Sequence, residues 1–171
     1  MSRVPVFEYF QYLLNLSLMI FIGADHRGRA LLENLTRNLA GLELDYKIIG
    51  EEFYSDEDDY TDFAKEVALK ILGNLDENLN ESFGILLCGS GQGVAIAANR
   101  FKGIRAGVCR KAEEIEIAKA DDNINVLCLP VTELVEDDDY NLDKMIRAFI
   151  ETRFKSDPKY QRRIEKLDLL P

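Results

Sequence analysis

A cysteine at the head of a glycine-rich loop is the feature of this sequence with the clearest chemical potential. Residues 84–100 read GILLCGSGQGVAIAANR, so Cys88 ends an apolar run and Gly89, Gly91 and Gly93 follow at alternate positions. Glycines tolerate positive φ and let backbone N–H groups approach a ligand without an intervening Cβ. Such a loop suits a phosphate or a developing oxyanion, although a tight structural turn would explain the same glycines.

The loop lacks the two common nucleotide-binding signatures. Val94 occupies the third glycine position of G-x-G-x-x-G, and no Lys-Ser or Lys-Thr pair follows as in a Walker loop. The thiol indicates a different chemistry, because a free cysteine has a pKa of about 8.5 that a helix N-terminus or a nearby cation can lower. A thiolate beside backbone amides suits enolate chemistry, in which the thiolate moves a proton and the N–H groups stabilise the oxyanion.

Two other interpretations of the cysteines stay open. Acyl transfer by a Cys/His pair would use His26, the single histidine, for which the sequence shows no distinctive orienting partner. Cys88, Cys109 and Cys128 each end or lie within an apolar run, where cysteine often serves as a small buried hydrophobe. The three show no CxxC pair and no Cys/His ligand spacing, which predicts a reducing, cytoplasmic location and no metal site.

The elements that position these residues are short apolar runs alternating with segments of helical periodicity. We expect strands at 19–24, 43–50, 83–88, 104–109 and 125–130. We expect helices near 27–40, 60–73, 92–101, 111–120 and 139–154, the second of them capped at its C-terminus by Gly73. This alternation predicts βαβ units, and therefore a three-layer α/β/α sandwich with a five-stranded parallel sheet, a Rossmann-like fold.

Ligands of such sheets bind beyond the carboxyl ends of the strands. That rule selects Asp25 and His26, Cys88 to Gly93, Cys109 to Lys111, and the loop after Pro130.

Composition and charge restrict the classes of protein to which the chain can belong. Its 171 residues are 47% hydrophobic and 30% charged, which suits one compact domain with a real core. The net charge of −10 argues against a nucleic-acid partner, because binding phosphates along a strand needs clustered Lys and Arg. Residues 153–167 do carry six Lys or Arg, which favours a small anionic ligand near that segment.

The N-terminal residues 1–18 are apolar but unlike a membrane span, because Glu8, Gln11 and Asn15 interrupt them. One basic residue and no convincing cleavage site make a signal peptide a poor explanation. We expect an N-terminal extension, either an added amphipathic helix or the product of an upstream misread start, and we favour the second. Residues 19–171 are then expected to form a single domain that ends in a basic helix.

Three segments resemble the ribose-5-phosphate isomerase B family, which includes the paired subunits of galactose-6-phosphate isomerase. They are IFIGADHRG at 20–28, GILLCGSGQGVAIAANRFKGIRAGVC at 84–109 and NVLCLP at 125–130, and the resemblance extends from about residue 19 to about residue 167. It implies a sugar-phosphate isomerase that interconverts an aldose and a ketose through an enediol(ate), without a metal or cofactor. It also implies ribose 5-phosphate as the first substrate to test, a place in the pentose phosphate pathway, and a homodimer or tetramer with sites between subunits.

The resemblance assigns roles to residues as well. Cys88 matches the base that moves the proton between the first two sugar carbons. Asp25 and His26 match an Asp-His pair that touches sugar hydroxyls and the ring or phosphate region, and Tyr60 matches a tyrosine of an Asp-Tyr-Pro stretch. The backbone N–H groups that match the enediolate cradle belong to Gly89, Ser90, Gly91, Gln92 and Gly93. From the residues alone, Asp25 could equally cap a helix, and Tyr60 could simply pack.

The sequence departs from the family at the residue that opens the furanose ring. The family has His-Asn-Asp-x-Asn-Val-Leu, but this chain has DDNINVL, so Asp121 stands at the histidine position and Asp122 at the asparagine position. Asp121 could protonate a ring oxygen only if burial or a neighbouring carboxylate raised its pKa well above about 3.9. A solvated acidic turn is the alternative.

A second departure concerns the phosphate. The family uses two C-terminal arginines that reach the phosphate across a dimer interface, and the nearest matches here are Lys159 and Arg163. Thr132 replaces a further family arginine after the last strand. Lysine can hold a phosphate as a point charge but lacks the guanidinium fork, and a surface helix with scattered charges would explain the same residues.

The acidic run at 51–62 is interpreted as a solvated loop, because it lacks the glycine and spacing of an EF-hand metal site. Two further functions stay open: an isomerase of another pentose or hexose phosphate, and a non-catalytic sugar-phosphate-binding subunit. No membrane partner is expected.

Overall fold

Five apolar runs of the sequence form strands, and all of them pair in parallel. The computed structural model describes residues 18–51, 54–76, 82–135, 137 and 140–170. The sheet order is β2-β1-β3-β5-β4, so the most apolar strands occupy its centre. The strands are β1 (Met19–Ala24), β2 (Asp45–Ile49), β3 (Ser82–Cys88), β4 (Ala106–Val108) and β5 (Val126–Pro130).

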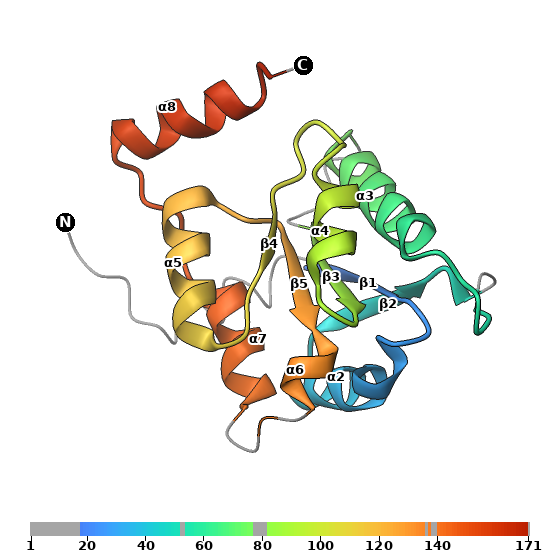
Figure 1. Ribbon diagram of the computed structural model, residues 1–171. Coiled ribbons are helices and arrows are strands. Elements are labelled where there is room, and N and C mark those ends of the chain that lie inside the picture. Colours follow the sequence, from blue (N-terminus) through green and yellow to red (C-terminus); the bar gives the residue numbers. More distant parts are fainter. Residues whose placement is uncertain (1–17, 52–53, 77–81, 136, 138–139, 171) are drawn as a thin grey trace.

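Helices cover both faces of this sheet (Figure 1). They are α2 (Arg29–Gly41), α3 (Tyr60–Asp76), α4 (Gln92–Ala98), α5 (Ala112–Asp122), α6 (Val131–Leu134), α7 (Leu142–Glu151) and α8 (Pro158–Leu167). Helices α2, α5 and α7 share one buried cluster with Ile85 and Leu87, while α3 and α4 share the other with Leu86 and Cys88. Because successive strand residues face opposite sides, β3 contributes to both clusters. The predicted three-layer α/β/α fold is confirmed.

Some expected boundaries are wrong. Gly73 does not end its helix, since α3 continues to Asp76 and Gly73 is not among the glycines with positive φ. The helix expected at 92–101 stops at Ala98, because the Asn99 side chain bonds the backbone of Ala106 as both donor and acceptor. The short helix α6 was not expected.

The basic C-terminal segment does form a helix, α8, which lies at the margin of the molecule (Figure 1). Asp157 caps it by accepting the Lys159 N–H at 2.9 Å, and Pro158 occupies its first turn. None of its residues is buried.

Residues 1–17 of the expected N-terminal extension lie outside the described residues, so that expectation stays a prediction. Within the described part of the chain, no helix is long and apolar enough to cross a membrane.

Helix α3 provides a test of the packing that supports the sheet. Ile71 is 1% exposed and packs against the sheet, whereas Leu69 on the same helix is 45% exposed. Ile71→Ala should lower the free energy of unfolding by about 2–5 kcal/mol, and Leu69→Ala by less than about 1 kcal/mol. Urea unfolding followed by circular dichroism measures both; equal losses would contradict this assignment of the buried face.

Candidate active site

The Cys88 thiol faces the glycine loop at the end of β3. Its Sγ accepts the N–H of Gly91 at 3.2 Å, so the loop folds back over the sulfur. The side chain is 5% exposed and belongs to the core cluster under α3 and α4. The sulfur therefore lies at the boundary between the core and the loop, with its polar contact directed toward the backbone amides.

Gly91 makes this geometry possible. Its φ is +72°, a left-handed conformation that residues with a side chain rarely adopt. A Cβ built there would lie 3.0 Å from Val108 Cγ1 and 3.3 Å from the Pro130 nitrogen. The neighbouring Gln92 N–H donates to Ser90 Oγ at 3.3 Å, which holds the tip of the loop. The glycine loop is thus a fixed turn whose Gly91 N–H is directed at the Cys88 sulfur.

Asp25 lies at the same edge of the sheet, because its own N–H bonds the carbonyl of Leu87 at 3.2 Å. The carboxylate is buried, and its Oδ1 accepts the Gly28 N–H at 2.7 Å. Burial raises the pKa of Asp25, while the Gly28 hydrogen bond and the charge of His26 act in the opposite direction. Asp25 therefore closes the turn before α2, and it also brings a carboxyl group to the loop.

His26 has the orienting partner that the sequence did not reveal. Asp58 Oδ1 lies 2.8 Å from Nδ1 of the ring and 3.0 Å from the main-chain N of His26. The Asp58 side chain is fully buried. Because a carboxylate only accepts, Nδ1 carries the proton and Nε2 is left facing away from Asp58. The interpretation of the whole acidic run as a solvated loop is therefore wrong at Asp58.

Tyr60 begins α3 and covers the last glycine of the loop. A Cβ built on Gly93 would lie 2.8 Å from Cζ of the Tyr60 ring, although the tyrosine remains 42% exposed. The ring is thus a wall of the loop and not a core residue. We call Asp25, His26, Tyr60 and Cys88 to Gly93, together with Arg27 and Asp58, which contact them, the carboxyl-edge group.

The other two cysteines lack this setting. Cys128 is fully buried, and burial raises its pKa well above the usual range. Burial also raises the pKa of Cys109 to about 11, with Glu114 contributing. Both fit the interpretation as small buried hydrophobes.

The Cys/His interpretation lacks its central contact. Among the described residues, no hydrogen bond joins Cys88 Sγ to His26. The His26 ring bonds Asp58, and the sulfur bonds the Gly91 amide.

The described residues also contain no group of three or more His, Cys, Asp or Glu side chains that could hold a metal ion.

The remaining predicted residues form a second cluster around the start of α8. Asp121 forms an ion pair with Lys155. The Lys155 Nζ lies 5.0 Å from the centre of the Tyr160 ring, and Lys159 Nζ lies 4.7 Å from it. The guanidinium of Arg163 lies 5.5 Å from the same ring. Three cations therefore surround one tyrosine.

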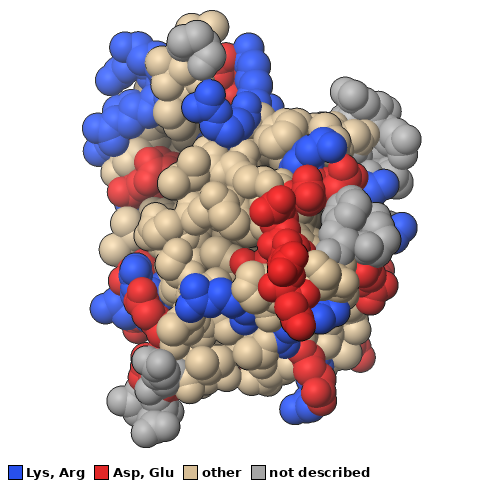
Figure 2. All heavy atoms as spheres, turned by 45° about the vertical axis from the view of Figure 1, so that its right-hand side comes forward, with Lys and Arg blue, Asp and Glu red and all other residues tan. Residues whose placement is uncertain are grey.

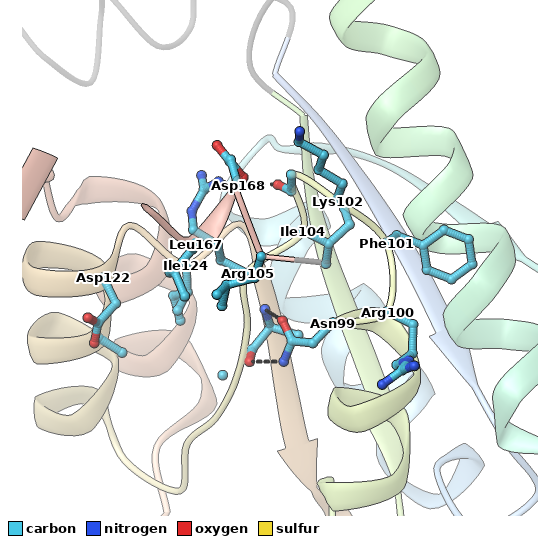
Figure 3. Close-up of a pocket in the computed structure, with 15 residues that line it drawn as sticks. Asn99, Arg100, Phe101, Lys102, Ile104, Arg105, Asp122, Ile124, Leu167 and Asp168 are labelled. Atoms are coloured by element: carbon cyan, nitrogen blue, oxygen red, sulfur yellow. Dashed lines mark hydrogen bonds between the residues drawn. The ribbon is translucent and has the colours of Figure 1, made fainter. Parts of the chain in front are cut away.

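Asp122 borders a hollow of about 550 Å³ next to this cluster (Figure 3). The hollow is lined by the end of α5, the 99–107 segment and the end of α8, and Arg105 and Asp168 also border it. Burial lowers the pKa of Arg105, with Asp168 acting in the opposite direction. We call Asp121, Asp122, Lys159 and Arg163 the amino-edge group.

The chain does not bring the two groups together. Helix α5 starts after β4 and runs back to the amino end of β5, so Asp121 and Asp122 lie at the opposite edge of the sheet from Cys88. Eleven helical residues span about 16 Å, which exceeds the length of a pentose phosphate. The backbone N–H of Lys155 bonds Ala120 at 2.9 Å and ties the start of α8 to the same edge.

Sequence reasoning missed two residues of the carboxyl-edge group, Asp58 and Arg27. The Arg27 guanidinium donates to Thr132 Oγ1 at 2.9 Å. Its position directly after Asp25 and His26 was a usable signal, because residues beyond a strand's carboxyl end gather there. Nothing in the acidic run distinguished Asp58 from its neighbours.

This arrangement defines the class of the protein: an open parallel α/β sheet whose candidate ligand site lies at the carboxyl ends of its central strands. The chain belongs to the Ribose/Galactose Isomerase family, whose profile matches residues 20–167.

Similar proteins agree with this membership. The probable ribose-5-phosphate isomerase B of Mycoplasma genitalium is 34% identical over 152 residues, which cover 89% of this chain and 95% of that protein. A crystal structure of a Thermotoga maritima ribose 5-phosphate isomerase has a TM-score of 0.73 and 36% identity, covering 89% of this chain and 98% of that one. The M. genitalium enzyme with bound ribulose-5-phosphate has a TM-score of 0.76 and 32% identity, covering 90% and 96%.

The single histidine allows a direct test of the Asp58 contact. In the unaltered protein, the ¹⁵N signals of the His26 ring should report a proton on Nδ1 at a pH where the ring is neutral. Asp58→Ala removes the acceptor, so the ring should show a mixture of both tautomers. Asp62→Ala, which alters an exposed carboxylate of the first turn of α3, is the control. An unchanged tautomer in Asp58→Ala would show that Asp58 does not orient the ring.

Proposed function

We propose that this chain interconverts ribose 5-phosphate and ribulose 5-phosphate, a step of the pentose phosphate pathway, with Cys88 as the base. The observation that carries the proposal is the Cys88 sulfur held 3.2 Å from the Gly91 amide, at the head of a loop of N–H donors. Membership of the Ribose/Galactose Isomerase family supports the reaction class.

The chemistry needs a group that moves one proton and a surface that holds one oxyanion. The Cys88 thiolate takes the proton from C2 of the open-chain aldose, and the electron pair moves onto the carbonyl oxygen to give an enediolate. Amides of the 89–93 loop other than those of Gly91 and Gln92, which bond Cys88 and Ser90, would hold that oxygen. A proton passes from the C2 hydroxyl to the C1 oxygen as the thiol returns its own proton to C1, so C2 becomes the carbonyl carbon, the ketose forms and the thiolate is restored. No metal or cofactor is required.

Asp25 and His26 would bind the sugar from the other side of the loop. A buried carboxyl group with a raised pKa can exchange hydrogen bonds with a sugar hydroxyl. The outer Nε2 of His26 can accept from a hydroxyl, because Asp58 holds the proton on Nδ1. Tyr60 covers the loop at Gly93 and would exclude water from one side.

We further propose that two copies of the chain make one complete site. The amino-edge group contains the residue predicted to open the ring, Asp121, and the two cations predicted to bind the phosphate, yet it lies at the far edge of the sheet from Cys88. In a two-fold dimer, each contact between two different residues forms twice, once in each direction. Each Cys88 would then face the Asp121 of the other copy.

Helix α8 has the properties of an arm in such a dimer. Its Tyr160, Ile164 and Leu167 recur at helical spacing, and none of them is buried against the described chain. Its basic residues are Lys159, Arg162, Arg163 and Lys166. Figure 2 shows basic side chains gathered at the end of the molecule where α8 lies. Packed against a partner's carboxyl edge, α8 would bury its apolar side chains and bring its basic side chains to the phosphate.

Replacement of the thiol tests the proposed base. Cys88→Ala should lower kcat for ribose 5-phosphate by about 10²- to 10⁴-fold, the usual contribution of a positioned base. It should also abolish exchange of the C2 hydrogen with deuterated water. Cys109→Ala is the matched control and should retain both activities, because Cys109 lies outside the loop and its pKa is about 11. Equal turnover by the unaltered protein and Cys88→Ala would reject Cys88 as the base.

Substrate identity is tested with the same assay. If ribose 5-phosphate is not turned over but another pentose or hexose phosphate is, the reaction class stands and the substrate assignment fails. If no aldose phosphate is turned over but several raise the melting temperature, the chain is a sugar-phosphate-binding subunit.

Complementation between two inactive variants tests the composite site. Cys88→Ala and Arg163→Gln should each be strongly impaired alone. In an equal mixture that has been unfolded and refolded together, half of the dimers are hybrids, and each hybrid has one intact site. Activity should therefore recover to about a quarter of the unaltered level. Recovery no greater than the sum of the two variants would show that each site belongs to a single chain.

A further inference from the structure

Arg27 lies in the turn between β1 and α2, and its guanidinium lies against the glycine loop. A Cβ built on Gly89 would lie 2.5 Å from Cζ of Arg27 and 2.7 Å from both Nε and Nη1. Any side chain at Gly89 would displace this guanidinium, so the absence of a Cβ is what allows the close approach. Because Gly89 directly follows Cys88, the positive charge lies at the head of the loop that the thiol faces.

One hydrogen bond holds the Arg27 guanidinium, and a second holds its partner, Thr132. Its Nη2 donates to Thr132 Oγ1 at 2.9 Å, and the Thr132 N–H donates to the Gly89 carbonyl at 3.0 Å. The three residues follow β1, β3 and β5, the three central strands of the sheet. The guanidinium therefore lies against the loop after β3 and bonds the residue after β5, at the exposed side of this edge of the sheet.

Among the described residues no ion pair to Arg27 is found, and the partner of its guanidinium is the neutral Thr132 hydroxyl. The nearby Arg110 differs, since it forms an ion pair with Glu133. Two carboxylates of this edge accept hydrogen bonds from other groups: Asp25 accepts from the Gly28 amide, and Asp58 accepts from His26. A fixed cation next to a loop of N–H donors is the arrangement that binds phosphate oxygens.

Arg27 also has donors to spare. A guanidinium carries five N–H groups, and the fork formed by two of them matches two oxygens of a phosphate. One nitrogen, Nη2, bonds Thr132, and the residue as a whole is exposed. The exposed side of the fork can therefore reach a ligand that enters from solvent above the loop.

We propose that Arg27 is a phosphate-binding residue of the carboxyl-edge group and that it makes this site selective for phosphorylated sugars. The inference rests on the proposed function, because it adds a cation at the carboxyl edge to those of a partner's α8 for the phosphate of the same substrate. It also accounts for Thr132, which stands where the resembling family has an arginine after its last strand. The guanidinium reaches that place from the turn after β1 and is anchored by the threonine.

Binding of inorganic phosphate tests this role without any turnover. Phosphate is titrated into the ¹⁵N-labelled protein, and the amide signals of Gly89 and Gly91 report binding at the loop. Arg27→Gln should weaken the affinity read at these amides by about 10- to 100-fold, the usual value for a lost hydrogen bond to a charged group. Arg27→Lys, which keeps the charge without the fork, should fall in between.

Arg37→Gln is the matched control, because Arg37 is an exposed arginine of α2 whose partner is Glu33. It should leave the affinity at the loop unchanged. Equal affinity in the unaltered protein and Arg27→Gln would overturn the proposal. Unperturbed Gly89 and Gly91 signals at saturating phosphate would overturn it as well, since the anion would then bind elsewhere on the chain.

Kinetics separate this role from a purely structural one. Arg27→Gln should raise KM for ribose 5-phosphate about tenfold or more and change kcat by less than about threefold, because the phosphate is bound equally before and during the proton transfer. A lower melting temperature and a lower kcat with an unchanged KM would show that Arg27 only braces the loops. If the unaltered protein turns over no aldose phosphate, the proposed function fails, while the phosphate titration still decides the role of Arg27.

Discussion

The parallel register of three central strands is the constraint on which the candidate site depends. Because Ala24 pairs with Leu87 and Cys88 pairs with Pro130, the residues that follow β1, β3 and β5 must meet at one edge of the sheet. Backbone hydrogen bonds also join these segments, from the Asp25 N–H to the Leu87 carbonyl and from the Thr132 N–H to the Gly89 carbonyl. The loops are therefore fixed by the sheet itself, and the side chains that they carry need little further ordering when a ligand binds.

The same constraint explains why the predicted site residues of one chain are divided between the carboxyl-edge group and the amino-edge group. A right-handed crossover returns the chain to the amino edge before every new strand, so a residue just before β5 cannot approach a residue just after β3. Asp121 and Cys88 are separated in this way by the whole height of the sheet. The proposed two-fold dimer would remove this separation, because the amino edge of one copy would lie against the carboxyl edge of the other. The unburied apolar stripe of α8 is consistent with that solution, since such a stripe usually packs against a partner.

Much of the fold could be predicted from the sequence, because apolar runs separated by helical periodicity have few other ways to bury both faces of a sheet. The candidate site was predictable where a position rule applied: Asp25, His26 and Cys88 follow strands. Local signals were weaker guides. Gly73 has the composition of a helix end, but the helix continues through it because α3 is stabilised by its packing on the sheet. Asp58 could not be distinguished from the acids around it, because its burial depends on a contact made 32 residues away.

The charge distribution connects the two halves of the proposed site. A net charge of −10 would repel a sugar phosphate at long range, but charges separated by more than about 8 Å are largely screened at physiological ionic strength. The cations within that distance therefore decide whether the phosphate is bound. On one edge they are the three around Tyr160, and on the other there is the Arg27 guanidinium over Gly89. Acidic residues farther away on the surface therefore weaken the binding of the phosphate little.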